Sequence, residues 1–308
     1  MVRSRTKFAI VSLCTLAISV VLGTVGILSS RASVLRTKDC DISAEHEVSV
    51  MSQNLRVTAV FDDGWDNFVM NRYGRVETLC NTYDADIKCF QEADYMWRIK
   101  LNAMFNEDEY YHDYYKNSKG LANPIYVKKS RFDIIDSGNF MVSDIYEKEV
   151  TKDGKKEIVE YEDRYATWVK VKDKNTGDTL TMVNTHLAFH EDVQIASCNK
   201  IIDFVSKCGT DGYLITGDFN FNMHKTSRYS IMTSKGTKDM AIAATKEGKT
   251  GVMSYTCHGF GKAANMQRID FFFGSDSLTS KMYTVVNDLI DGQFASDHYG
   301  ILTYIDIN

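Results

Sequence analysis

The stretch Tyr213-Leu214-Ile215-Thr216-Gly217-Asp218-Phe219-Asn220 decides how the rest of the sequence is interpreted. Apolar and β-branched side chains in its first half are typical of a buried strand. Gly217 permits a sharp backbone turn. Asp218 and Asn220 share a face if the extended geometry continues beyond the strand. A carboxylate and a carboxamide there can hold a polar substrate or a hard cation, although a strand followed by an Asx turn is the ordinary explanation.

The same pattern recurs along the chain. Several predicted strands end at side chains that can bind a cation or transfer a proton. Strands are expected over 55–61, 86–91 and 180–184, and a last one over 299–305. Each polar residue beside them, taken alone, is explained by a turn, a helix cap or an ordinary hydrogen bond. The repetition is what indicates a site. Its members are Asp62, Glu92, His186, Asp218, Asn220, Asp270, Asp297 and His298.

Asp270 differs from the others because it lies inside the apolar strand expected over 268–273. A buried carboxylate is costly unless it is paired. The sequence therefore predicts a partner for Asp270, and His298 is the candidate.

Composition is compatible with one large domain or two ordinary ones. The chain has 308 residues, 44% of them hydrophobic and 12% aromatic, including 17 tyrosines. This aromatic content suits a strand-rich fold. The formal net charge of −5 shows no broad basic footprint of the kind that a high-affinity nucleic-acid binder carries.

The N-terminal segment predicts export. Arg3, Arg5 and Lys7 precede residues 8–30, which carry no charged side chain and are long enough to span a bilayer as a helix. We expect 1–32 to be a signal-anchor or a cleaved signal peptide, 33–53 a linker, and 54–308 the domain. The domain would then lie outside the cytoplasmic membrane, tethered through 8–30 or secreted.

The candidate set excludes several classes of enzyme and favours one. No serine lies in a nucleophile elbow, and no cysteine has the flanks of a thiol catalyst. Neither a phosphate-cradling glycine loop nor a dinucleotide fingerprint is present. Carboxylate oxygens favour Mg²⁺, or Mn²⁺, over zinc. Two histidines with acids to orient them suit proton transfer, so the set matches metal-assisted attack of water on a phosphoester.

Five sequence blocks resemble those of the endonuclease/exonuclease/phosphatase superfamily, the DNase I-like metal-dependent phosphoesterases. They occur in the order of that family, and the resemblance covers roughly residues 54–308. The blocks are Gln91-Glu92, Asn184-Thr185-His186-Leu187, Gly217-Asp218-Phe219-Asn220, Arg268-Ile269-Asp270 and Ser296-Asp297-His298.

The resemblance implies an α+β fold, a four-layer α-β-β-α sandwich of two packed mixed β-sheets preceded by the N-terminal transmembrane or signal helix. The site would lie at one edge of the sheets. Glu92 would bind Mg²⁺, with Asp297 helping or belonging to a second site. The family usually has Asn after the first strand, where this chain offers Asp62, or Asp63 with a shift of one position, as the metal ligand.

The same resemblance implies a role for each catalytic candidate. His298, oriented by Asp270, would be the general base that activates water. Asp218 would position the nucleophile or a metal. Asn220 would contact the phosphate, and His186 would stabilise the developing negative charge.

The substrate stays open between nucleic acid, a phospholipid headgroup and a sugar phosphate. A nuclease would bring Lys128, Lys129, Arg131 or the run Tyr110–Tyr115 to the rim of the site. A lipid or small-phosphate hydrolase would have an apolar rim or a tight pocket. A family member that binds a phosphorylated ligand without catalysis is the further alternative, and no obligate protein partner is evident.

Overall fold

A computed structural model describes residues 47–58, 64–152, 154–247 and 254–308. The chain divides into two compact units, Met1–Asp41 with Thr78–Asp84, and Ile42–Glu77 with Ala85–Asn308. The described residues contain only the end of one helix from the first unit, and the described strands all belong to the second. The expected anchor, 8–30, and the candidate ligand Asp62 both lie outside the described residues.

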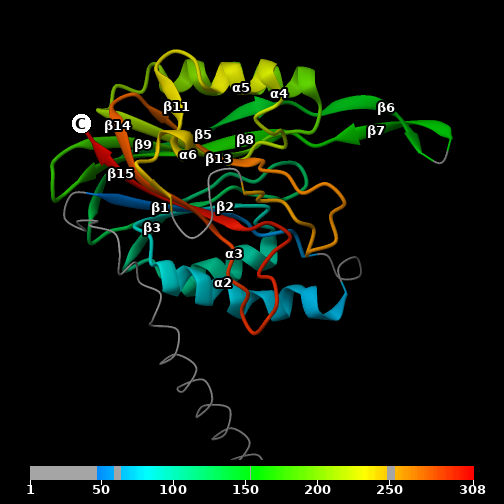
Figure 1. Cartoon of the computed structure of the whole chain (residues 1–308), viewed down its shortest axis with the longest axis horizontal. Helices are drawn as coiled ribbons and strands as arrows, with labels where there is room; N and C mark the ends of the chain where they lie inside the picture. Colours follow the sequence, from blue (N-terminus) through cyan, green and yellow to red (C-terminus); the bar gives the residue numbers. More distant parts are fainter. Residues whose placement is uncertain (1–46, 59–63, 153, 248–253) are drawn as a thin grey trace, which may run out of the picture. The chain divides into compact units, whose positions relative to one another are not determined.

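Two mixed β-sheets form the second unit (Figure 1). The first sheet has the order β12-β14-β15-β1-β2-β4-β3, and the second has the order β11-β13-β10-β9-β8-β5. The strands of the first sheet are β1 (Val48–Asn54), β2 (Ile87–Gln91), β3 (Tyr110–Asp113), β4 (Ile125–Lys128), β12 (Lys246–Glu247), β14 (Leu278–Val286) and β15 (Gly300–Ile307). Those of the second are β5 (Phe132–Ser143), β8 (Arg164–Asp173), β9 (Thr179–His186), β10 (Gly212–Asp218), β11 (Thr237–Asp239) and β13 (Asp270–Ser275).

Apolar side chains hold the two sheets face to face. Val50 and Ile87 of the first sheet share one buried cluster with Val169, Leu214 and Phe272 of the second. Burial of this kind is worth about 25 cal/mol per Å² of apolar surface, so the contact between the sheets stabilises the fold. It also fixes the strand ends of the two sheets next to one another.

Helices cover the outer faces of the sandwich. α4 packs Ile201, Ile202 and Val205 onto the second sheet, with α5 beside it (Figure 1). On the first sheet, the aromatic rings of Phe90 and Tyr126 meet Phe105 at the end of α3. The helices are η2 (Trp65–Asn67), α2 (Val69–Tyr83), α3 (Tyr95–Met104), α4 (Glu191–Val205), α5 (Thr226–Met232) and α6 (Met240–Ala243).

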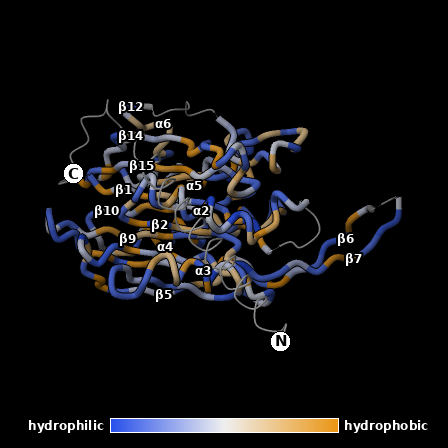
Figure 2. Tube along the Cα trace, turned by 90° about the horizontal axis from the view of Figure 1, so that it is seen from below, coloured by the Kyte–Doolittle hydropathy of each residue, from blue (hydrophilic) through white to orange (hydrophobic). Residues whose placement is uncertain are grey.

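A two-stranded hairpin, β6 (Tyr146–Lys152) and β7 (Lys155–Tyr161), projects from the second sheet. Figure 2 shows it as a mainly hydrophilic arm beyond the sheets. The pair Asp153-Gly154 between these two strands is a sequence signal of a β-hairpin. In the described part of the chain, no helix combines the length and the apolar character needed to cross a bilayer.

The first strand lies earlier than its sequence pattern indicated. β1 occupies Val48–Asn54, and every residue in it is buried, so 48–53 belong to the sheet and not to a linker. The expected strand over 55–61 is wrong for its described part, since residues 55–58 form no strand. The physical reason is that a central strand has two buried faces, so Ser49 and Ser52 interrupt the apolar pattern without reaching solvent.

Candidate active site

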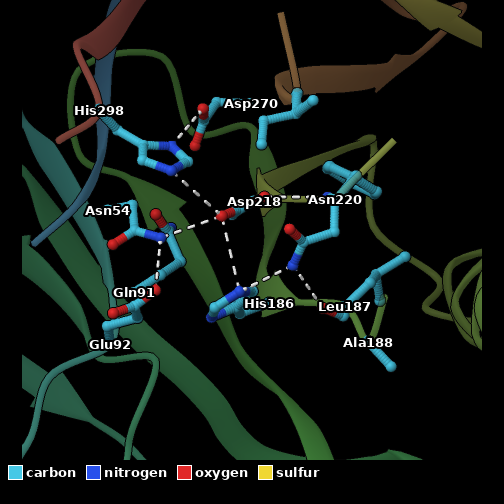
Figure 3. A network of polar contacts seen from close by, with 12 residues as sticks. Asn54, Gln91, Glu92, His186, Leu187, Ala188, Asp218, Asn220, Asp270 and His298 are labelled. Atoms are coloured by element: carbon cyan, nitrogen blue, oxygen red, sulfur yellow. Dashed lines mark hydrogen bonds and ion pairs between the residues drawn. The ribbon is translucent and has the colours of Figure 1, made fainter. Parts of the chain in front are cut away.

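The polar residues of the site gather where neighbouring strands end. β9 and β10 are parallel, so their carboxyl ends meet at one edge of the second sheet. In the register, Asp218 stands between His186 on β9 and Asp270 on β13. β1 and β2 are also parallel and bring Asn54 beside Gln91 on the first sheet. Figure 3 shows these groups converging.

Gly217 is required by a close approach of two strands, and not by the turn that the sequence pattern predicted. It lies within β10 with φ of 141°, a conformation that favours glycine. A Cβ at this position would overlap the carbonyl oxygen of Thr185 on β9. The missing side chain therefore lets β9 and β10 close up directly before His186 and Asp218.

Asp270, His298 and Asp218 form a buried chain of charged groups. His298 Nδ1 lies 2.9 Å from Asp270 Oδ2, and its Nε2 lies 3.8 Å from Asp218 Oδ2. Burial alone lowers the pKa of His298, but the two carboxylates outweigh it and hold the pKa well above its usual value. Burial and the charge of Asp270 raise the pKa of Asp218 to about 7, against the opposing charge of His298. The predicted partner of Asp270 is thus confirmed by the geometry.

His186 is held as a neutral imidazole. Burial, the guanidinium of Arg164 and the charge of His298 lower its pKa well below the usual value. The Asn220 amide donates to Leu187 O at 2.8 Å, which fixes its orientation, and the same Nδ2 lies 3.0 Å from His186 Nε2. Nε2 must then accept, so the ring proton is on Nδ1.

Asn220 has both amide hydrogens engaged in this way. In this arrangement its direct effect is on His186, while its predicted contact with phosphate stays a prediction. Asn220 also has a left-handed backbone, with φ of 52°, and its N–H donates to Asp218 Oδ1 at 2.9 Å. Such strain costs on the order of 1 kcal/mol and persists where surrounding contacts hold it, as they do here.

Asn54 is the functional candidate that sequence reasoning missed. Its Nδ2 lies 3.1 Å from Glu92 Oε1 and 3.0 Å from Asp218 Oδ2, so one amide group joins carboxylates from the two sheets. Val57 N donates to Glu92 Oε2 at 2.9 Å. Asn54 ends the first strand, the position where the resemblance called for Asn. The alternation of Val48 and Val50 is the sequence signal that could have located this first strand and, at its end, Asn54.

Two amides fasten the sheets together behind these groups. Gln91 Nε2 donates to Asn184 Oδ1 at 2.7 Å, and Asn184 Nδ2 donates to Phe90 O at 2.8 Å. All three residues are buried. The bonds are therefore strong constraints on the spacing between Glu92 and His186, which follow these strands.

Asp297 lies at the margin of the site. Its Oδ2 is 3.7 Å from Arg56 Nε, and its side chain is half-buried. It belongs to the loop that precedes β15 and carries His298. The carboxylate thus has a cationic neighbour, and its role as a metal ligand stays a prediction.

The donor set suits a hard divalent cation. Ligand atoms of Asp218, Asp270 and His298 all lie within 4.8 Å of one another and could hold a metal. His298 and Asp270 are, however, already bonded to each other, whereas Glu92 and Asp218 share only one neutral amide. Burial first, and then the negative charge of Asp270, raise the pKa of Asp218, and a cation bound to the carboxylate would offset both effects. Oxygen donors of this kind favour Mg²⁺ or Mn²⁺.

The fold and the site together define a DNase I-like sandwich with a polar edge built from strand ends. Solved structures with this fold belong to the endonuclease/exonuclease/phosphatase family, so the resemblance read from the sequence is confirmed at the level of the fold. Neither a protein-family model nor a curated protein sequence matches the chain.

Three solved structures illustrate the likeness. An endonuclease/exonuclease/phosphatase from Bacteroides vulgatus is 24% identical with a TM-score of 0.72, covering 85% of this chain and 99% of that one. A mannosyl-6-phosphatase from Bacteroides thetaiotaomicron is 20% identical with a TM-score of 0.67, covering 84% and 99%. The D. rerio TDP2 structure, complexed with a single-strand DNA product, is 15% identical with a TM-score of 0.64, covering 84% and 99%.

Proposed function

We propose that this chain is a divalent-metal-dependent phosphoesterase of the endonuclease/exonuclease/phosphatase family. The observation that carries the proposal is the convergence of Asp218, Asp270 and His298 with His186 and with the Asn54–Glu92 pair at one edge of two sheets. The shared fold supports it, because the neighbours named above include a sugar-phosphate phosphatase and a protein bound to a DNA product.

The chain's own residues can perform the proton transfers of hydrolysis. His298 donates Nδ1–H to Asp270, which leaves Nε2 directed at Asp218. His298, oriented by Asp270, accepts the proton of the attacking water through its Nε2. As the water oxygen bonds to phosphorus, the ester P–O bond breaks and the leaving oxygen takes a proton from solvent.

Glu92 and Asp218, with Asn54 between them, are the residues that we assign to Mg²⁺ or Mn²⁺. A bound divalent cation supplies positive charge to the phosphate oxygens. We assign to His186, a neutral imidazole with its proton on Nδ1, the stabilisation of the negative charge that develops on the phosphoryl group. Asn220 keeps the imidazole in that tautomer.

The positions of the cations favour a small phosphoester over a long nucleic acid. Lys128 lies 3.8 Å from Asp86, and Arg131 pairs with Asp86 and Asp173. These contacts are at the beginning of β2, whereas the site is at its end. Lys128 and Arg131 therefore do not supply the basic rim that a nuclease would need at this site.

We propose that the reaction takes place outside the cytoplasmic membrane, with 8–30 as anchor or signal. The uncharged segment behind three basic residues supports this. External protease added to intact cells should remove the domain. A domain that is protected until the cells are lysed would contradict the proposed location.

The enzymatic proposal is tested with the full-length chain, purified in a mild detergent. We expect hydrolysis of p-nitrophenyl phosphate or its bis-ester with Mg²⁺ or Mn²⁺, and none with EDTA. Asp218→Asn and His298→Gln should each lower kcat by about 10²- to 10⁴-fold. Asp192→Asn, an exposed carboxylate bonded to Lys148, is the matched control. Unchanged rates in both site variants would refute the assignment, and calorimetric binding of a phospho-ligand without turnover would favour the non-catalytic alternative.

A further inference from the structure

A small hollow lies beside His186. It is lined by Tyr115, Asn117, Leu121, Asn123, Arg164, Tyr165 and His186, and holds about 10 Å³. That is room for one water-sized group. Because His186 forms part of its wall, any group in the hollow is next to a residue that the proposed function assigns to the phosphoryl group.

Arg164 lines the hollow and brings a hydrogen-bond donor to it. Its side chain is only 7% exposed, and its Nη2 donates to Glu162 Oε1 at 2.6 Å. The buried Nε has no hydrogen-bond partner among the described residues. A buried donor of this kind is costly unless an acceptor reaches it. The guanidinium is also close enough to lower the pKa of His186.

Hydrogen bonds within the protein hold the part of the wall that Asn117 and Leu121 form. Asn117 accepts from Lys119 N and Leu121 N, which closes the 117–121 loop on itself. Arg98 Nη1 donates to Gly120 O at 2.7 Å, and Ser118 N donates to Asp163 Oδ1 at 2.8 Å. The loop is thus tied both to α3 and to the residue that precedes Arg164.

We propose that this hollow is a subsite that recognises one hydroxyl group of the alcohol part of the substrate. The inference rests on the proposed phosphoesterase function. Arg164 Nε would donate to the hydroxyl oxygen. The neighbouring carboxylate of Glu162 would repel a second anion, so a neutral hydroxyl fits better than a second phosphate. The rings of Tyr115 and Tyr165, with centroids 4.4 Å apart, form an aromatic side against the carbon skeleton.

The corresponding substrate class is a phosphate ester of a sugar-like polyol. A polyol carries a hydroxyl close to the ester oxygen, where an unsubstituted alkyl or aryl ester has only carbon. A site built to bond a hydroxyl discriminates against an analogue without it, because its own polar group is then left unpaired. One hydrogen bond to a charged donor corresponds to about a 10- to 100-fold preference.

The test compares a hexose 6-phosphate with cyclohexylmethyl phosphate, which has the same ring without hydroxyl groups. Calorimetry with the full-length chain and Ca²⁺ measures binding of each compound, whether or not turnover occurs. We expect the hexose phosphate to bind at least about tenfold more tightly. In Arg164→Met the ratio should fall towards one. Arg131→Lys, an equally buried arginine at the opposite end of the sheet, is the matched control and should keep the wild-type ratio.

Equal affinities in the wild type, or a ratio that Arg164→Met leaves unaltered, would overturn the subsite and leave the hollow to a structural water. Turnover of either ester with Mg²⁺ or Mn²⁺ reports separately on the proposed function. Equal hydrolysis of both esters would support the proposed phosphoesterase function and contradict the subsite. Tighter binding of the hexose phosphate without hydrolysis of either ester would support the subsite and contradict the phosphoesterase function.

Discussion

At the scale of single residues, the amide group of Asn54 holds two carboxylates of the candidate active site in position. Without its Nδ2, Glu92 and Asp218 would lose the neutral donor that holds both carboxylates. Groups that orient metal ligands in this way are typically worth about 10- to 100-fold in activity. We therefore expect Asn54→Ala to lower kcat/KM by that factor.

Steady-state kinetics at saturating Mg²⁺ or Mn²⁺ checks this expectation. Asn71→Ala is the control, because the Asn71 amide is exposed and bonds only to the backbone of Trp65 among the contacts described. Wild-type kcat/KM in Asn54→Ala would show that the two carboxylates keep their positions without the amide.

His258 makes stability depend on pH in the acid range. Its ring is buried between Phe294 and Tyr299, and Nδ1 accepts from Gly261 N at 3.2 Å. Burial, with the charge of His298, lowers its pKa to about 4, below the unfolded value of 6.5. The unfolded chain therefore binds a proton that the folded chain does not, and stability falls as the pH drops from 6.5 towards 4.

Urea unfolding at pH 6.5 and pH 4.5 measures this effect in wild type and His258→Phe. We expect the wild type to lose more free energy of unfolding than the variant over this interval. The comparison between the two proteins removes the contribution of Asp218, whose raised pKa acts with the opposite sign. Equal losses would mean that His258 titrates normally in the fold.

At the scale of elements, the pairing of β9 with β10 depends on Gly217. The Cβ of an alanine would overlap Thr185 O, which belongs to backbone and cannot rotate away. We expect Gly217→Ala to lower the free energy of unfolding by about 3 kcal/mol or more. Circular dichroism during urea unfolding gives the measurement.

Gly177→Ala separates the clash from the backbone conformation. Gly177 also has a positive φ, 86°, but nothing lies within 4 Å of its added Cβ. A cost of about 1 to 2 kcal/mol is expected there from the left-handed conformation alone. Equal costs in the two variants would contradict the close approach of the strands.

At the scale of the whole molecule, the site is also a concentration of negative charge between two sheets. Glu92 and Asp218 come from different sheets, so a cation bound to both would link them. Binding to the folded state alone stabilises by about 2.7 kcal/mol at a hundredfold excess over Kd. We expect Mg²⁺ or Mn²⁺ to raise Tm, and Asp218→Asn to reduce that rise.

Differential scanning fluorimetry with a metal titration checks the linkage without any substrate. Na⁺ at matched ionic strength controls for screening. The same rise in Tm for wild type and Asp218→Asn would place the cation elsewhere.

Local pattern predicted much of the fold because the strands of the second sheet alternate or run apolar over their whole length. Residues 180–184 and 213–216 lie in β9 and β10 as expected. The expectations from sequence do not include β14, α5 or α6. These elements are short or mixed in polarity, and tertiary contacts decide their structure.

The sequence by itself determined which chemical groups stand at strand ends and that Asp270 needed a partner, because a buried charge and an apolar run are local properties. Only the tertiary structure decided that Asn54 joins Glu92 to Asp218 and that Arg164 lines a hollow beside His186. It also decided that Lys128 lies at the end of its sheet opposite the site. Strand order and register place these residues, and both arise from pairing between segments that are distant along the chain.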